Sequence, residues 1–485
     1  IASPTSDTIT LFENLPLPSA NFAIDQDVAE GTTATVTAFL NRIASSYPVT
    51  IPFTISGTAV NPADHNAVNA AITINSGLVG STTFSVVSDA IIDSDETVIF
   101  TMGTVINAVA GTSSIHITTI REQNLIPDVT LSAGQNGVQR RLIITTDGNV
   151  TLTATVLDIN PLDTHSYNWS LTNNNLVDNN LDADPATFVF DPSGLTAGFY
   201  KARVTITDDG TPLLTAESEL LLEVLISAPV LATTDSDNDG IADNIESFGD
   251  SDFDGIPDYL DSNTLNSNEL QASPLQSESY IIRTEAGLSL GLSDIAFAAN
   301  KGGANITTAD IANYGDGEGN AGTASAVDTV VNRGGYFDFK ITGLPKAGQS
   351  VQIVLPQIAP LGAGAVYRKY DPNTGWRNFA IDANNTIASA PGSPGTCPLP
   401  GDSAYIAGLA NGSYCIQLTI EDGGPNDKDA SANHIIDDPS GLVKMENSSV
   451  AEDSGGGVLN KIVIWFLLAW FLLIWYGVVS RRRYS

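Results

Sequence analysis

The chain has 485 residues, enough for three or four domains, and 42% of them are hydrophobic, so most of it is expected to fold. Its formal net charge of −35 argues against binding to nucleic acid or anionic lipid and suits divalent cations. Turn-forming residues abound and long amphipathic helical patterns are missing before the C-terminal tail. We therefore predict a mainly β protein, with several β-sandwich domains in a string, an Asp-rich linker and one C-terminal transmembrane helix.

Residues 1–20 hold one strand-like run, "DTITLF", which we interpret as a strand or linker from a preceding region. Because the chain starts at Ile1 without a Met or a signal peptide, we interpret it as the C-terminal part of a longer or processed precursor.

Residues 21–122 alternate polar and apolar positions in short runs between turn-rich pieces, which is typical of a β-sandwich. The order of "VAEGTTATVTAFL", "VTIPFTISGTAVNPADH" and "GSTTFSVVSDAIIDSDETVIF" resembles a Calx-beta domain. This resemblance implies acids that bind Ca²⁺ at one end of the sandwich, at Glu30, Asp64, Asp89, Asp93, Asp95 and Glu96. A sandwich with solvated acidic loops and no metal is the alternative.

Residues 128–227 form a second alternating unit. The pair "SYNWSL" and "GFYKARVTITDDG" resembles PKD-like domains of immunoglobulin fold, which places Trp169 in the core rather than in a binding site.

Residues 235–262 contain "DSDNDGIADNIESFGDSDFDGIPDYLD", which combines acids with regularly spaced apolar residues. The calcium-loop template D-x-[DN]-x-[DN]-G-x₅-E fits its first half, because alternate residues of a tight loop point inward and Gly permits the sharp bend. The predicted ligands of the first loop are Asp235, Asp237, Asp239, the Ile241 carbonyl, Asp243 and Glu246. Those of the second loop are Asp250, Asp252, Asp254, the Ile256 carbonyl, Asp258 and Asp261.

This repeat resembles thrombospondin type 3 repeats, a family in which Ca²⁺ ions form the core of the segment. We expect the interspersed apolar residues to pack the two loops together, and the segment to act as a metal-set hinge or spacer. The alternative is a disordered acidic linker.

Residues 278–443 include "GGYFDFKITGLPKAGQSVQIVLP" and "AVYRKYDPNTGWRNF", which resemble a choice-of-anchor U domain. Near its end, Asp422, Asp427 and Asp429 fit a Ca²⁺-ordered loop, with a network of Asx turns as the alternative. If the tail spans a membrane, most of the chain lies outside the cytoplasm, and a disulfide between Cys397 and Cys415 is then favoured over two reduced thiols.

The tail comprises a Gly-rich linker at 444–461, an uncharged segment at 462–479 and a basic end at 480–485. The uncharged segment is long enough to cross a bilayer, and the Arg cluster after it predicts a cytoplasmic end. Together with Gly455, Gly456 and Gly457, these features resemble a GlyGly-CTERM sorting signal. The resemblance implies a Gram-negative bacterium, cleavage by a rhomboid-type protease and delivery to the cell surface or the medium. A plain single-span anchor is the alternative.

The sequence contains no HExxH motif, and we expect no enzymatic activity. The leading hypothesis is a calcium-binding structural or adhesive surface protein that contacts surface glycans or like modules and reaches the membrane through its C-terminal helix. The alternatives are the carrier region of an exported hydrolase and a subunit of a self-assembling surface filament.

Overall fold

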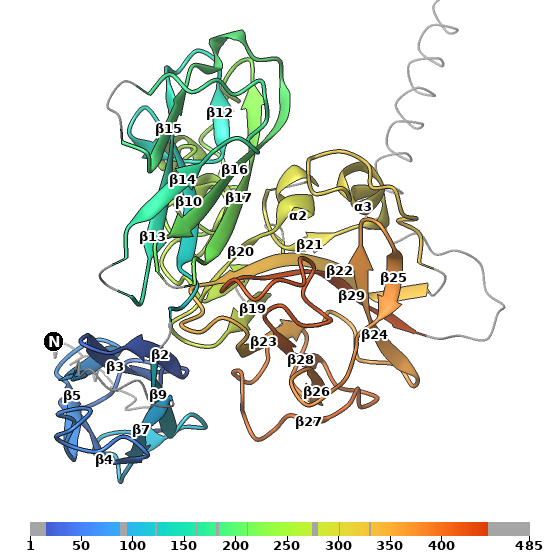
Figure 1. Ribbon diagram of the computed structural model, residues 1–485. Coiled ribbons are helices and arrows are strands. Elements are labelled where there is room, and N and C mark those ends of the chain that lie inside the picture. Colours follow the sequence, from blue (N-terminus) through green and yellow to red (C-terminus); the bar gives the residue numbers. More distant parts are fainter. Residues whose placement is uncertain are drawn as a thin grey trace, which may run out of the picture. The chain divides into compact units, whose positions relative to one another are not determined.

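The computed structural model describes residues 16–87, 95–121, 124–160, 163–180, 184–210, 212–273, 280–299, 301–328 and 331–444, without the side chains of 331–334 and 443–444. The described chain is mainly β, as predicted, and its sheets pair into sandwich-like layers (Figure 1). The sorting glycines 455–457, the predicted span 462–479 and the basic end lie outside the described residues. No helix within the described ranges is long and apolar enough to cross a membrane.

The first domain has two sheets, with strand orders β6-β3-β1-β8 and β2-β9-β7-β4-β5. In β3 (Thr33–Leu40) the polar and apolar residues alternate between exposed and buried positions, as the sequence predicts. Val36, Phe53 and Phe100 are among the core residues between the sheets. The other strands are β1 (Ser19–Phe22), β2 (Gln26–Ala29), β4 (Val49–Gly57), β5 (Ala70–Ile74), β6 (Val79–Ser85), β7 (Glu96–Met102), β8 (Val109–Ala110) and β9 (Ile115–Arg121).

The second domain is also a two-sheet sandwich, ordered β11-β10-β13-β15 and β12-β17-β16-β14. Its longest pair is β16 (Gly198–Asp208) with β17 (Thr215–Leu225), in antiparallel register. Trp169 lies at the border of the core, half-buried, with its ring 5.5 Å from that of Phe188. The remaining elements are β10 (Asp128–Gln135), β11 (Val138–Gln139), β12 (Leu142–Ile144), β13 (Val150–Leu157), β14 (His165–Asn168), β15 (Thr187–Phe190) and the 3₁₀ turn η1 (Pro192–Gly194).

The acid-rich segment holds only two short turns of helix, α1 (Asp243–Glu246) and η2 (Asp258–Leu260). These turns are in contact, and the rings of Phe248 and Tyr259 meet edge to face, 5.8 Å apart. The segment is therefore folded onto itself rather than extended.

The last domain has two larger sheets, ordered β18-β19-β23-β28-β26-β27 and β20-β22-β29-β24-β25, with β21 paired to β22. It begins at β18, before the predicted boundary at 278, and it contains two helices that the sequence did not suggest. Its helices are α2 (Asp294–Ala299) and α3 (Thr308–Tyr314). Its strands are β18 (Glu269–Gln271), β19 (Ile281–Thr284), β20 (Ser289–Leu292), β21 (Asn305–Ile306), β22 (Val331–Thr342), β23 (Ser350–Pro356), β24 (Ala365–Asp371), β25 (Gly375–Asn378), β26 (Thr386–Ala390), β27 (Ile406–Ala407), β28 (Cys415–Glu421) and β29 (Ile436–Lys444).

Candidate metal centre

The first acid-rich loop is closed by bonds from its backbone to its own carboxylates. The amide of Gly240 donates to Asp235 Oδ2 at 3.1 Å, and the amide of Ile241 donates to Asp239 Oδ1 at 2.7 Å. The turn requires positive φ at Asn238 and Gly240, which Asn tolerates and Gly adopts freely. The carboxylates are thus held on the inside of the turn.

The second loop repeats these bonds fifteen residues later. Gly255 donates to Asp250 Oδ2 at 3.1 Å, and Ile256 donates to Asp254 Oδ1 at 2.7 Å. Phe253 and Gly255 take the same positive φ as their counterparts. The two loops, which differ between their acids only at Asn238 and Phe253, therefore adopt the same turn, as the template predicts.

Each loop brings three carboxylates together. One ligand atom from each lies within 4.8 Å of the others, for Asp235, Asp237 and Asp239 in one loop and for Asp250, Asp252 and Asp254 in the other. Four oxygens of these loops are buried and have no hydrogen-bond partner among the described residues: Asp237 Oδ2, Glu246 Oε2, Asp250 Oδ1 and Asp252 Oδ2. Asp237 and Asp252 occupy equivalent positions, so both loops leave an oxygen free at the same place.

When no cation is bound, the surroundings of the loop carboxyl groups oppose their ionisation. Burial is the first cause of each shift, and neighbouring carboxylates add repulsion. The pKa of Asp237 and of Asp252 rises to about 6, and that of Glu246, Asp250 and Asp261 to about 7. The pKa of Asp254 is raised well above its usual range by the same causes. A hard divalent cation bound among these oxygens would offset both costs.

Two predicted ligands, Asp243 and Asp258, accept hydrogen bonds that close the loops. Asp243 accepts hydrogen bonds from the Ser236 amide at 2.8 Å and from Thr234 Oγ1 at 2.7 Å. Asp258 likewise accepts from the Ser251 amide at 2.8 Å. Both lie outside the three-carboxylate groups and close the loops instead.

The apolar residues of the two loops differ, which corrects the expectation that they all pack the loops together. Ile256 is fully buried in a hydrophobic cluster, whereas its counterpart Ile241 is 45% exposed and Ile245 is 72% exposed. The Ile256 cluster includes Leu142 and Leu221 of the second domain together with core residues of the last domain. The second loop is thus part of a shared core.

The second loop is also tied by its backbone to both neighbours. The Asp250 amide donates to the Gln139 carbonyl at 3.1 Å, and the Leu292 amide donates to the Asp254 carbonyl at 2.6 Å. The guanidinium of Arg141 stacks on Phe297, 3.8 Å from the ring centroid. The prediction of a spacer is therefore wrong for this segment, because the domains on its two sides contact each other directly.

The acids predicted for the first domain do not form such a group where the structure describes them. Asp95 pairs with Arg121, and Asp64 accepts a hydrogen bond from the Val60 amide. Glu30 and Glu96 belong to none of the three-carboxylate groups found in the described ranges. Asp89 and Asp93 lie outside those ranges. Calcium binding by this domain stays a prediction.

The acids near the end of the last domain accept hydrogen bonds mainly from backbone amides, as in the Asx-turn alternative. Asp422 accepts from the Gly348, Asn433 and His434 amides, and Asp427 from the Gly423 and Asp437 amides. Neither these two nor Asp429 belongs to a three-carboxylate group in the part of the chain described.

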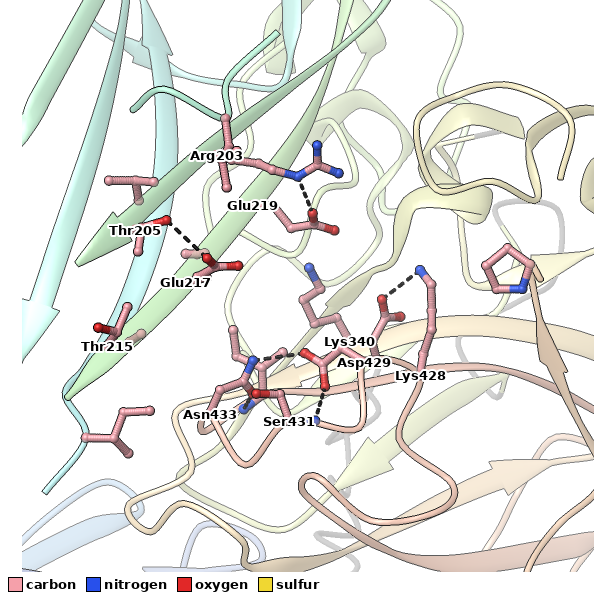
Figure 2. A pocket seen from close by; sticks show the side chains of 18 of the residues that line it. Arg203, Thr205, Thr215, Glu217, Glu219, Lys340, Lys428, Asp429, Ser431 and Asn433 are labelled. Atoms are coloured by element: carbon pink, nitrogen blue, oxygen red, sulfur yellow. Dashed lines mark hydrogen bonds and ion pairs between the residues drawn. The ribbon is translucent and has the colours of Figure 1, made fainter. Parts of the chain in front are cut away.

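Asp429 lines a cavity of about 480 Å³ between β17 and the loop that precedes β29 (Figure 2). Two ion pairs form among its lining residues: Arg203 Nε lies 2.9 Å from Glu219 Oε2, and Lys428 Nζ lies 2.9 Å from Asp437 Oδ2. Asp429 accepts from the Ser431 amide at 2.9 Å. This arrangement offers no carboxylate group comparable with the two loops.

The predicted disulfide is confirmed: Cys397 and Cys415 are bonded. Cys415 begins β28 and is fully buried, so the bond ties the preceding loop to the sheet.

A third carboxylate group was missed by the sequence analysis. Asp158, Asp163 and Asp208 bring oxygens within 4.8 Å of one another in the second domain. His165 Nε2 lies 2.7 Å from Asp158, and Asn124 donates to Asp208 at 3.0 Å. Asp208 ends β16 opposite His165 of β14, and His165 contacts Asp158, so strand pairing between distant segments brings Asp208 into the group and no local pattern could have revealed it.

No protein-family model matches the chain, and no curated protein matches it. Among solved structures, the apo form of the Calx CBD1 domain is similar at 15% identity, over 21% of this chain and 96% of that domain, with a TM-score of 0.20. The calcium-binding domain CBD12 of CALX1.1 is similar at 12% identity, over 43% of this chain and 82% of that structure, also with a TM-score of 0.20. At these values the likeness adds no argument about the ligand of this chain.

Proposed function

We propose that the chain is a calcium-binding structural or adhesive protein, in which each acid-rich loop holds one Ca²⁺. One observation carries this proposal: two loops fifteen residues apart make the same bonds from backbone amides to carboxylates, and both leave buried oxygens unpartnered. A loop that offers only oxygen ligands suits Ca²⁺, since Mg²⁺ usually keeps several of its waters.

The proposal places the protein outside the cytoplasm, at the cell surface of a Gram-negative bacterium or released from it. The disulfide supports an oxidising compartment. Ca²⁺ is plentiful there, and metal binding coupled to folding would complete the acid-rich segment after export. The sequence of the tail supports a membrane anchor removed by a rhomboid-type protease. Surface glycans or like modules are the proposed partners, and the role is structural rather than catalytic.

Isothermal titration calorimetry of the chelated protein tests the two sites. We expect two Ca²⁺ per chain at millimolar Ca²⁺ or below, and one in each of Asp237→Asn and Asp252→Asn, which alter equivalent positions. We also expect Ca²⁺ to slow proteolysis between Asp235 and Asp261. Absence of binding heat, or loss of both sites in either variant, would contradict the proposal of two separate loops.

A further inference from the structure

Lys369 and Asp438 form a buried contact inside the last domain, apart from the acid-rich loops. Lys369 Nζ meets Asp438 Oδ1, and the two residues are 1% and 0% exposed. Lys369 lies on β24 and pairs with Ser440 of the adjacent antiparallel strand β29. Asp438, two residues before Ser440, is thus a diagonal neighbour of Lys369 on the same face, within reach of a long side chain.

The surroundings of this contact exclude water. Asp438 stands opposite Phe339 on β22, and Phe339 is fully buried. Tyr367 is also buried, and its hydroxyl lies 2.8 Å from Ser440 Oγ. Asp438 Oδ2 has no hydrogen-bond partner among the described residues. A charged pair in this place carries a large desolvation cost.

Burial favours the neutral forms of both partners. It lowers the pKa of the Lys369 ammonium, against the attraction of Asp438, and it raises the pKa of the Asp438 carboxyl. A proton moved from Lys369 to Asp438 leaves a free amine against a carboxylic acid. An amine held beside a carboxyl carbon has the proximity that a bond-forming reaction needs.

Lys201 and Asp294 are a matched contrast, since they also form a buried contact, at 2.5 Å. Here burial alone would raise the pKa of Asp294, yet Lys201 and three further cations lower it. Burial likewise opposes the charge of Lys201, but its acidic neighbours raise its pKa. This pair therefore stays ionised, and an ammonium has no lone pair with which to attack.

We propose that Lys369 and Asp438 condense to form an intramolecular isopeptide bond between β24 and β29. The Lys369 Nζ–Asp438 Cγ bond forms, and one Cγ–Oδ bond breaks. The ammonium and carboxylate together hold three protons, of which one stays on the amide nitrogen and two leave with the oxygen as water. The reaction needs no oxidant, metal or other reactant, and it is independent of the calcium sites.

Peptide mapping of the full chain tests this bond. Trypsin cuts after Arg368, Arg377, Lys428 and Lys444, and it cuts after Lys369 only when the amine of Lys369 is free. In the linked chain Lys369 and Asp438 therefore fall in fragments 369–377 and 429–444, whereas the unlinked chain yields 370–377 and 429–444. We expect a single branched fragment whose mass is the sum of 369–377 and 429–444 less one water, and fragmentation spectra that place the link at Lys369 and Asp438. Recovery of only the linear peptides 370–377 and 429–444 would overturn the proposal.

Two controls test whether the bond joins Lys369 to Asp438 and whether it requires a neutral pair. Asp438→Ala must lose the branched fragment, and a branched mass that persists there would contradict the assignment. The fragments that contain Lys201 and Asp294 should remain linear. A loss of water between them would show that dehydration does not depend on a neutral pair, which would refute the argument from burial.

Discussion

The substitution Asp250→Asn is expected to stabilise the fold without calcium and to destabilise it when calcium is bound. Asp250 is 8% exposed, and burial, with repulsion from Asp252, raises its pKa from 3.8 to about 7. A shift of three pKa units corresponds to about 4 kcal/mol. At pH 7.5 the metal-free fold is therefore destabilised by about this amount, relative to the unfolded chain, when this carboxyl ionises. An Asn removes the charge and can still accept the hydrogen bond of the Gly255 amide. The metal-free variant should therefore be more stable than the unaltered chain.

With Ca²⁺ the same substitution removes a ligand. A site at one hundred times its dissociation constant stabilises the fold by about 2.7 kcal/mol, and most of this is lost in the variant. Thermal melting with EGTA and with Ca²⁺ measures both effects. Asp235→Asn is the matched control: Asp235 fills the same slot of the first loop but is exposed, so its metal-free effect should stay within about 0.5 kcal/mol. A lower melting temperature for Asp250→Asn in EGTA would refute the reasoning.

Three further predictions concern the same molecule. The folded pKa of Asp250 is raised, so its bound proton stabilises the metal-free fold fully below about pH 4, and this stability is lost as the pH rises through about 7. Melting in EGTA should therefore occur at a higher temperature at pH 5 than at pH 7.5, and the reverse order would contradict this assignment. Ile256→Ala should cost about 2–5 kcal/mol in denaturant unfolding, whereas Ile241→Ala, at a side chain that is 45% exposed, should cost less than about 0.5 kcal/mol. Replacing Cys397 and Cys415 with Ser should lower stability by about 3 kcal/mol, and reduction of the unaltered chain should match the double variant.

The sequence revealed the features whose residues are neighbours in the chain. In each acid-rich loop the acids and the Gly at positive φ lie within twelve residues, so spacing alone predicted the turn and the inward carboxylates. The alternation of β3 gave its buried face in the same way. The disulfide was predictable because only two cysteines exist, close together.

Features built by long-range pairing were not predictable. Asp208 reaches Asp158 because β16 pairs with β14, where His165 stands opposite Asp208 and contacts Asp158. Lys369 meets Asp438 because β24 pairs with β29. Ile241 and Ile256 occupy the same slot of one template, yet only Ile256 is buried, since only the second loop has domains packed against it. Equal local patterns therefore had unequal tertiary surroundings.

The contact between the second and last domains has a mechanical consequence. Arg141 and Lys201 of the second domain bind Leu292 and Asp294 of the last one, so the two domains are joined by more than the acid-rich segment. A pulling force applied through the two domains must first rupture these buried bonds before it can extend the loops. Extension would then expose Ile256 and open the second carboxylate group, so that tension would release an ion bound there as proposed. Under that proposal, load on the chain and the calcium concentration would act on the same segment.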